Sequence, residues 1–389
     1  MQSTAEAFSI LDSVAFSLKE KEVALWDARY LVLSQTVFSP INMPPFRQSN
    51  VDGFAIALHD GLEYAIVGEV KAGDGHSLWL EPGQAVKIFT GAAVPDSAQA
   101  VVPIENAVQN NGQLLIEQLV LPESNIRALG SQISKNAIAL EKGTYLNPAA
   151  IGFLAGLGMT SVRVYLKPKV GVVITGSELV IPGLPLPHGK VYESNGIMLK
   201  AALAEAHYEA VTLYAVADDF DLTKTILGTA IAENDLLVIS GGISVGDHDY
   251  VGRALQSLKA TTLFYKVNQK PGKPLWAGQW EDKLIFALPG NPAAGLTCFY
   301  IYVLPTLAKL SGIQTKYNAT LQKRLAHDYS VSNSRCQFLK AIVSGGQVTI
   351  LSHQDSAMLN SFALANALVY LQEGTYQKVL GDKVAVYPI

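Results

Sequence analysis

Four runs that are typical of buried strands are each followed by a polar or glycine-rich segment: VGVVIT (170–175), VTLYAV (211–216), DLLVIS (235–240) and LIFAL (284–288). In an open parallel sheet, ligands bind beyond the carboxyl ends of the strands, because loops and helix N-termini with free backbone N–H groups converge there. The residues after the four runs are therefore candidates for a binding site: Gly176, Ser177 and Glu178; Asp218 and Asp219; residues 241–250; and Pro289, Gly290, Asn291 and Pro292.

The segment from Ser240 to Tyr250 contains three glycines and two carboxylates. Glycine lets backbone approach an anion, and carboxylate oxygens hold hard cations such as Mg²⁺. The alternative is an ordinary strand-to-helix turn, and Glu178 and Asp218 would likewise suit a helix cap or first turn. The convergence of these groups at one sheet edge favours a functional site. The selected residues of the segment are Gly241, Gly242, Ser244, Gly246, Asp247 and Asp249.

A cluster of three lysines follows, with Lys266, Lys270 and Lys273 inside the segment KVNQKPGKP. Pro271 and Gly272 prevent a continuous helix, so the cations lie on a loop. Lysine is a compact point charge that suits phosphate and other oxyanions, and the cluster would offset the repulsion between two anionic substrates. A solvated basic turn is the alternative interpretation.

Two earlier turn-like segments supply weaker candidates. QSNVDGFA places Asp52 before Gly53, and IFTGAAVP places Thr90 before Gly91. Each is an ordinary turn signal when taken alone. Only their combination with the segments above makes them candidates for a site.

Composition excludes several classes of protein. Lys+Arg of 29 against Asp+Glu of 33 gives a net charge of -4, without the basic excess of a nucleic-acid binder. Cys298 and Cys336 form no CxxC pair and fit reduced structural thiols. The start of the chain lacks an export signal, and the longest apolar run, 293–308, falls short of the ~20 residues that span a bilayer. We therefore expect a cytoplasmic protein that inserts into no membrane. The sequence also lacks GxxxxGK[ST], GxGxxG after a strand and HExxH.

The order of these patterns predicts an α/β protein of several domains. Helix-like apolar spacing runs from Ala5 to Thr36, short strand-like runs fill 52–132, and strands alternate with helices from Val170. Such alternation is typical of a doubly wound parallel sheet. The expected domains are an N-terminal helical and linker domain (1–40 with 137–166), a β-rich inserted module (41–136), a doubly wound α/β domain (167–312) and a C-terminal all-β domain (313–389).

Taken together, these segments resemble the molybdopterin molybdenumtransferase family of the MoeA type, which includes the C-terminal domain of gephyrin. The matching stretches, in order, are QSNVDGFA, GEVKAG, KIFTGAAVPDSAQAVVPIE, VGVVITGSELVIPG, VYESNG, SGGISVGDHDY, KPGKP and FALPGNPAA. The resemblance implies an elongated homodimer of four-domain subunits. Its active site would lie between the α/β domain of one subunit and the β-rich module of the other.

The reaction that the resemblance implies depends on Mg²⁺. Adenylylated molybdopterin and molybdate enter, the phosphoanhydride is cleaved, AMP leaves, and the pterin's dithiolene sulfurs hold the molybdenum. Because soft sulfur ligands on the pterin bind the metal, the protein needs no cysteine cluster. Molybdopterin adenylyltransferase, the enzyme of the neighbouring step, is the partner protein that this implies.

The resemblance also suggests roles for single residues. Glu178, Asp218 and Asp249 would bind Mg²⁺ and handle phosphate, and Asp52 and Thr90 would form the second-subunit wall and place molybdate. The residues implied to bind the pterin substrate and its anionic groups are Gly241, Gly242, Ser244, Gly246, Asp247, Lys266, Lys270, Lys273, Pro289, Gly290 and Asn291.

The chain departs from the family pattern at three places. Where the family usually has G-E-D, this chain has Gly130-Ser131-Gln132. Where the family usually has Q-G-S, this chain has Gln354-Asp355-Ser356. In place of the usual Gly-Arg, it has Ala28-Arg29-Tyr30. Gln132 hydrogen-bonds but offers Mg²⁺ no carboxylate. Asp355 would restrict a backbone that in glycine is free to take positive φ. These changes indicate a divergent member of the family.

Three other functions compete with molybdenum insertion. A molybdopterin adenylyltransferase shares the α/β domain but would consume ATP, and it leaves the module with Asp52 and Thr90 unexplained. A non-catalytic pterin carrier or scaffold predicts tight binding without turnover. A competence-type nicotinamide-nucleotide amidohydrolase shares the α/β fold but does not explain QSNVDGFA or KIFTGAAVP.

Overall fold

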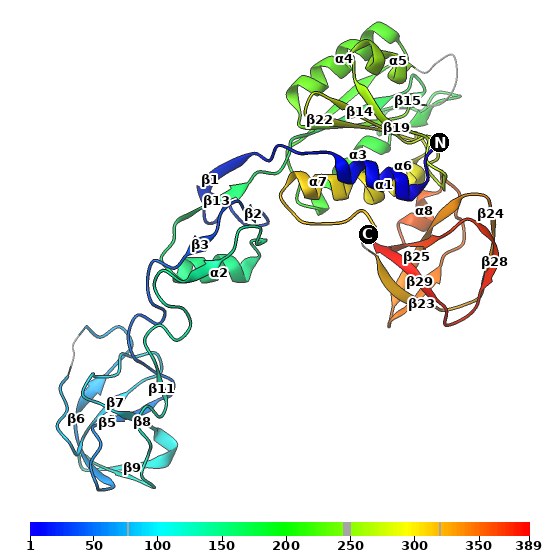
Figure 1. Ribbon diagram of the computed structural model, residues 1–389. Coiled ribbons are helices and arrows are strands. Elements are labelled where there is room, and N and C mark those ends of the chain that lie inside the picture. Colours follow the sequence, from blue (N-terminus) through cyan, green and yellow to red (C-terminus); the bar gives the residue numbers. More distant parts are fainter. Residues whose placement is uncertain (76–77, 244–249, 319) are drawn as a thin grey trace. The chain divides into compact units, whose positions relative to one another are not determined.

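The computed structural model describes residues 1–75, 78–243, 250–318 and 320–389 (Figure 1). It divides the chain into two compact units. Unit 1 comprises residues 1–21, 30–32 and 165–389, and unit 2 comprises residues 22–29 and 33–164. Each unit has its own core, and each is described by itself below.

A six-stranded sheet forms the centre of unit 1, in the order β17-β14-β18-β22-β21-β19. The first four strands are parallel: β17 (Val211–Val216), β14 (Val170–Thr175), β18 (Leu236–Ser240) and β22 (Lys283–Leu288). The last two, β21 (Trp276–Trp280) and β19 (Thr261–Tyr265), continue the sheet antiparallel. Every residue of β14 and β18 is buried, as expected of strands covered on both faces.

Helices cover both faces of this sheet (Figure 1). Val170, Val172 and Ile174 of β14 pack in one core with α3 (Asn195–Glu205) and α6 (Pro292–Cys298). Val173 points to the opposite face, because successive strand residues alternate, and packs with α4 (Phe220–Glu233) and α5 (Tyr250–Ser257). The doubly wound α/β domain that the sequence predicts is confirmed.

The apolar run that begins at α6 forms one continuous helical segment, Pro292–Leu310. It passes from α6 through a π-helical stretch (Phe299–Val303) into α7 (Leu304–Leu310). Its length and composition would suit a membrane span, yet 67% of its apolar window is buried inside the molecule. Most of this segment is therefore packed inside unit 1.

The N-terminal segment differs from the sequence prediction. Helix α1 spans only Thr4–Ser13, although helix-like spacing continues to Thr36, and the chain then forms β1 (Glu20–Ala24) and β2 (Val32–Leu33). Ser3 and Glu6 build a capping box at the start of α1. Beyond it, β1 and β2 both pair with β13 (Ser161–Tyr165), so sheet pairing overrides the local helical pattern.

The C-terminal part of unit 1 is a closed barrel. Five strands follow the order β25-β26-β23-β29-β27, and β27 pairs again with β25. Their bounds are β23 (Leu321–Leu325), β25 (Cys336–Ser344), β26 (Gln347–Ile350), β27 (Ala367–Leu371) and β29 (Lys383–Pro388). β20 (Gln269–Lys270) pairs with β25, which connects the lysine-bearing loop to the barrel. A ribbon of β24 (Tyr329–Asn333) and β28 (Gly374–Lys378) and a short helix α8 (Leu359–Phe362) complete this part.

Unit 2 contains a second six-stranded sheet, in the order β8-β5-β7-β6-β10-β9. Successive residues of β5 alternate between two cores: Phe54 and Ile56 pack in one, and Ala55 packs in the other. The remaining bounds are β6 (Glu63–Val70), β7 (Gln84–Ile88), β8 (Ala100–Pro103), β9 (Ala107–Asn110) and β10 (Gln113–Ile116), with β5 at Gly53–Ile56. Short pairs β3 (Val37–Phe38) with β12 (Ile138–Leu140) and β4 (Gln48–Ser49) with β11 (Ile126–Arg127), the 3-10 turn Ile104–Asn106 and helix α2 (Pro148–Gly156) complete it.

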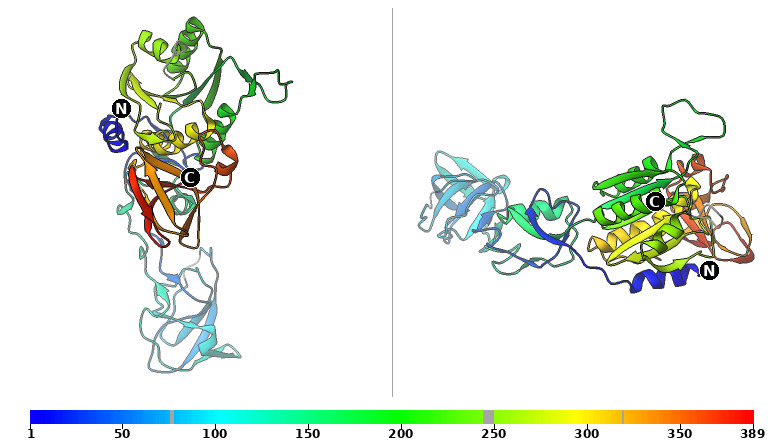
Figure 2. Two further views of the ribbon diagram at one scale, coloured as in Figure 1. Left: turned by 90° about the vertical axis from the view of Figure 1, so that its right-hand side faces the viewer. Right: turned by 90° about the horizontal axis from the view of Figure 1, so that it is seen from above.

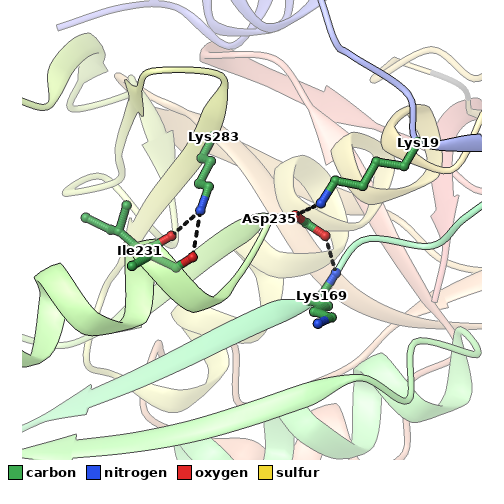
Figure 3. Close-up of polar contacts among 6 residues, drawn as sticks. Lys19, Lys169, Ile231, Asp235 and Lys283 are labelled. Atoms are coloured by element: carbon green, nitrogen blue, oxygen red, sulfur yellow. Dashed lines mark hydrogen bonds and ion pairs between the residues drawn. The ribbon is translucent and has the colours of Figure 1, made fainter.

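Asp235, which precedes β18, contacts two other segments of unit 1 at the amino-terminal ends of the parallel strands (Figure 3). Its carboxylate accepts from the Lys19 ammonium at 2.6 Å and from the Lys169 backbone N–H at 2.9 Å. Burial raises the pKa of Asp235, but these hydrogen bonds outweigh it and hold the pKa below its ordinary value. Nearby, the Lys283 ammonium donates to the Ile231 carbonyl near the end of α4. All of these contacts lie at the amino-terminal ends of the parallel strands, opposite the carboxyl ends where the sequence predicts the site.

Candidate functional site

A cleft of about 750 Å³ lies at the carboxyl ends of β14, β18 and β22 in unit 1. We call it the carboxylate cleft, because the charged side chains on its described walls are Glu178, Glu193 and Asp218. Figure 2 shows the chain between β14 and α3 extending from the domain as a loop. In this loop, β15 (Leu179–Val180) pairs with β16 (Val191–Tyr192). The lining residues also include Thr175, Gly176, Ser194, Asn195, Ser240, Gly241, Gly242, Pro289, Gly290 and Asn291.

Glu178 and Asp218, two of the three carboxylates expected to bind Mg²⁺, both line this cleft. Asp218 accepts a hydrogen bond from the Ser177 N–H at 2.9 Å, and its own N–H donates to the Ser177 hydroxyl at 2.9 Å. The side chain that caps α4 is Asp219, through the Leu222 N–H, and not Asp218. The capping alternative therefore applies to Asp219, and the Asp218 carboxylate lines the cleft instead.

Glycines 241 and 242 bring the backbone close to the end of β14. Their φ angles are 92° and 65°, in the region that disfavours side chains. A Cβ atom on either residue would meet the Thr175 hydroxyl oxygen, at 2.8 and 2.9 Å. The Gly-rich segment is thus built for close approach as far as Ile243. Ser244, Gly246, Asp247 and Asp249 lie outside the described residues.

Asn195, to which the sequence assigned no role, connects two walls of the cleft. Its amide nitrogen donates to the Ser240 hydroxyl at 2.9 Å and to the Gly290 carbonyl at 2.8 Å. Its amide oxygen is buried with no hydrogen-bond partner among the described residues. Its position at the first residue of α3, separated from β16 by Glu193 and Ser194, is the signal that would have indicated it.

A second cavity of about 440 Å³ lies between the lysine-bearing loop and the barrel. We call it the lysine pocket. Its described lining contains three cations, Lys270, Lys273 and Arg335, and one carboxylate, Asp355. It is completed by Pro271, Gly272, Pro274, Pro289, Asn291, Ala294, Gln354 and Ser356. Such an excess of cations suits an oxyanion.

The lysine-bearing loop is held by buried contacts at its centre. Gly272 has φ of 88°, and a Cβ atom there would lie 2.4 Å from the Cys298 sulfur. Buried Gln269 donates to the Gly272 carbonyl and accepts from the Tyr302 hydroxyl. Burial raises the pKa of Cys298 to about 12, so this thiol stays protonated and serves packing.

Lys266 differs from the other two lysines. It does not line the lysine pocket, and its ammonium lies 4.8 Å from the centre of the Tyr265 ring. Arg335 takes a place beside Lys270 and Lys273 that the sequence did not suggest. It is distant in sequence, and only the pairing of β20 with β25 brings it to the loop.

Asp52 and Thr90 lie together in unit 2. The Asp52 carboxylate accepts from the Thr90 hydroxyl and from the Thr90 N–H, both at 2.7 Å. The hydroxyl and then the N–H hold the pKa of Asp52 below its ordinary value, so the carboxylate is ionised at neutral pH. The pair thus forms a fixed, exposed anion.

The expected backbone restriction at Asp355 is not observed. In the loop that carries Gln354-Asp355-Ser356, the residue with positive φ is His353, at 59°, and not Asp355. The prediction that Asp355 restricts the backbone was therefore wrong. Asp355 instead accepts the Ala357 N–H at 2.9 Å. At another departure, Tyr30 takes φ of 63° and stacks on His207 with 4.0 Å between ring centres.

No group of three His, Cys, Asp or Glu side chains gathers in a metal-binding arrangement among residues 1–75, 78–243, 250–318 and 320–389. Asp249, the third carboxylate of the expected Mg²⁺ set, lies outside that range. Glu178 and Asp218 line one cleft and supply the oxygen ligands that Mg²⁺ prefers. The described residues therefore fit part of a Mg²⁺ site.

Family models match three parts of the chain. These are the MoeA N-terminal region (domains I and II) over residues 2–158, a probable molybdopterin-binding domain over 171–309 and the MoeA C-terminal region (domain IV) over 322–389. Together they span most of the sequence.

Full-length relatives give the same result. The chain is 31% identical to a molybdopterin molybdenumtransferase of Haemophilus influenzae, over 97% of this chain and 96% of that protein. It is 32% identical to one of Bacillus subtilis, over 94% and 88%. A crystal structure of the molybdopterin biosynthesis MoeA protein from Pyrococcus horikoshii superposes with a TM-score of 0.85 and 28% identity, covering all of both chains.

Proposed function

We propose that this chain, which belongs to the MoeA family of molybdenum cofactor biosynthesis, is a molybdopterin molybdenumtransferase. It would insert molybdenum from molybdate into adenylylated molybdopterin and release AMP. One observation of the site carries the proposal: a cleft with carboxylates and a pocket with cations share Pro274, Pro289 and Asn291. A reaction between two anionic substrates needs both kinds of group close together.

We assign the adenylylated pterin to the carboxylate cleft. At about 750 Å³ it is large enough for a cofactor-sized ligand. Gly241 and Gly242 line it with backbone, against which the phosphate chain can lie. Asn195 holds the Gly290 carbonyl and fixes the opposite wall.

Glu178 and Asp218 are the residues that would hold Mg²⁺ in this cleft. Both are exposed carboxylates on its wall, and Asp218 is oriented by two hydrogen bonds with Ser177. When bound there, Mg²⁺ supplies neutralisation of the phosphate oxygens and polarisation of the phosphoanhydride. Asp249 remains part of this proposed set.

We assign molybdate to the lysine pocket. Lys270, Lys273 and Arg335 would balance the charge of an oxyanion, with the donors of Asn291 and Ser356 beside them. Asn291 lines both cavities, so an oxyanion held here would lie next to the pterin cleft. The proximity of the two substrates is the main contribution that this geometry makes to the reaction.

The assay that tests the function is AMP release from adenylylated molybdopterin by the purified protein. Molybdate and Mg²⁺ are each omitted in turn, and Mg²⁺ is restored after chelation. We expect release only when both are present. Tight pterin binding without AMP release under all conditions would contradict the proposal and leave a carrier.

We further propose a cytoplasmic homodimer in which Asp52 and Thr90 of one subunit form a wall of the other subunit's active site and help to place molybdate. This rests on the family resemblance and on the fixed anion that the two residues form. Mixing inactive Asp52→Ala and Glu178→Ala subunits tests it, because a mixed dimer would contain one site with both residues intact. Recovery of AMP release on mixing is expected. If the mixture stays inactive while mixed dimers form, the shared site is wrong.

A further inference from the structure

Lys340 is a buried lysine outside both cavities. It lies on β25 with only 3% of its surface exposed. Its ammonium donates to three backbone carbonyls: His353 at 2.7 Å, Met358 at 3.0 Å and Asp355 at 3.2 Å. An ammonium has three donors, so every one of them is used.

Burial lowers the pKa of Lys340, and the Asp355 carboxylate opposes this shift. A buried ammonium is unfavourable unless it is fully hydrogen-bonded. The three carbonyls belong to one loop, residues 351–358, so the charge is accommodated only while that loop keeps its conformation. Replacing the ammonium leaves three inward-facing carbonyls without their donor.

Gln354 holds the same loop from the other direction. Its amide oxygen accepts the Lys340 backbone N–H at 2.9 Å, and its amide nitrogen donates to the Lys340 carbonyl at 2.9 Å. The amide also donates to the Leu351 carbonyl at 2.8 Å. The loop is therefore fixed to β25 by two independent side chains.

The outer side of this loop forms a wall of the lysine pocket, through Gln354, Asp355 and Ser356. The Ser356 carbonyl accepts the Ala294 N–H in the first turn of α6, at 3.1 Å. The Ser356 hydroxyl accepts the Asn291 amide at 2.9 Å. Since the Asn291 side chain does not cap its own helix, Ser356 supplies the contact that orients it.

We propose that Lys340 is a positioning residue for oxyanion binding: it holds loop 351–358 so that Ser356 fixes Asn291 and the wall of the lysine pocket. Lys340 itself does not touch the substrate. The inference rests on the proposed function, because it takes the lysine pocket as the molybdate site. Its role resembles that of the outer hydrogen bonds that orient ligands in a metal site.

The test compares Lys340→Met and Gln354→Met with Lys383→Met, which removes an exposed lysine of the same barrel. We expect the first two to raise the KM for molybdate about tenfold. The kcat at saturating molybdate should stay within about twofold, because binding and not the chemical step is affected. Lys340→Arg, which keeps the charge and donors, should restore part of the affinity, and Lys383→Met should change nothing.

Two outcomes would overturn the inference. One is an unchanged KM in folded Lys340→Met and Gln354→Met, even with a lower melting temperature, which would make the contacts purely structural. The other is a loss of kcat in Lys340→Met and Gln354→Met that is as large as their rise in KM, with no recovery in Lys340→Arg. If Lys340→Met does not fold, Lys340→Gln, which keeps two donors in place of three, takes its place, and an unchanged KM for molybdate overturns the inference.

Lys273→Ala, measured in parallel, separates this inference from the proposed function. If Lys273→Ala leaves the KM for molybdate unchanged, the lysine pocket is not the oxyanion site and both assignments fail. If Lys273→Ala raises the KM and neither loop variant does, only the role of Lys340 fails.

Discussion

The carboxylate cleft and the lysine pocket differ in charge although they share three residues, Pro274, Pro289 and Asn291. The charged groups on the described walls of the cleft are acidic, whereas the pocket has three cations and one carboxylate. Two anionic substrates side by side repel each other, and in a low-dielectric site that repulsion is strong. The carboxylates of the cleft can act on an anion only through a bound cation, whereas the cations of the pocket face an oxyanion directly, so the two cavities should be separable by mutation.

The largest effect is expected in the carboxylate cleft. Glu178→Gln keeps the size of the side chain but removes a charge, so it should lower the kcat for AMP release about 100-fold. The KM for molybdate should change little, because the lysine pocket is untouched. Steady-state kinetics with varied Mg²⁺ measure both.

Asp282→Asn is the matched control for Glu178→Gln. Asp282 is exposed in the turn before β22, at the opposite end of the sheet. It should retain full activity. Equal losses in the two variants would show that charge at a distance, and not the cleft, controls turnover.

The next largest effect is expected in the lysine pocket. Lys270→Ala and Lys273→Ala should each raise the KM for molybdate about tenfold with little change in kcat, which is the signature of lost ground-state binding. The reverse result, a loss of kcat alone, would show that the two cavities do not divide their tasks. Lys266→Ala is the internal control, because Lys266 lies outside the pocket and its ammonium lies over the Tyr265 ring.

A smaller effect in the opposite direction is expected from the carboxylate in the lysine pocket. Asp355 lines the same pocket as the cations, and its negative charge opposes an incoming anion. Asp355→Asn should therefore lower the KM for molybdate about twofold to fourfold, a size typical of an exposed charge. The change should shrink in high salt because solvent ions screen it. A higher KM would mean that Asp355 supports the pocket through its bond to the Ala357 N–H.

The sequence predicted the carboxylate cleft better than the lysine pocket, for a physical reason. Residues after parallel strands must meet at one sheet edge, so Glu178, Asp218 and Asn291 were found from local patterns. Arg335 and Ser356 come from the barrel, and nothing local in their sequence indicates which loop they approach. Lys340 looked like an ordinary strand residue, since burial and the three carbonyls are properties of the tertiary fold.

The same reason explains why the helix predicted for residues 5–36 is mostly absent. The apolar spacing of residues 5–36 predicts a helix, but only Thr4–Ser13 is helical. Pairing of β1 and β2 with β13, more than a hundred residues away in the chain, determines the rest. Long-range strand pairing leaves little trace in a local pattern.

A variant at the amino-terminal ends of the parallel strands should affect neither cavity. Asp235→Asn weakens the contacts with Lys19 and the Lys169 N–H, so it should lower the free energy of unfolding by about 1–2 kcal/mol at pH 7 without changing the kinetics. Because the folded-state pKa of Asp235 is lowered, its contribution is present above its ordinary pKa of about 4 and is lost as the pH falls through the folded value. Denaturant unfolding from pH 7 to pH 3 should therefore show the variant and the parent converging at acidic pH. A constant difference over that range would mean that the Asp235 contacts do not depend on its charge, and a changed KM would mean that the two sheet edges are coupled.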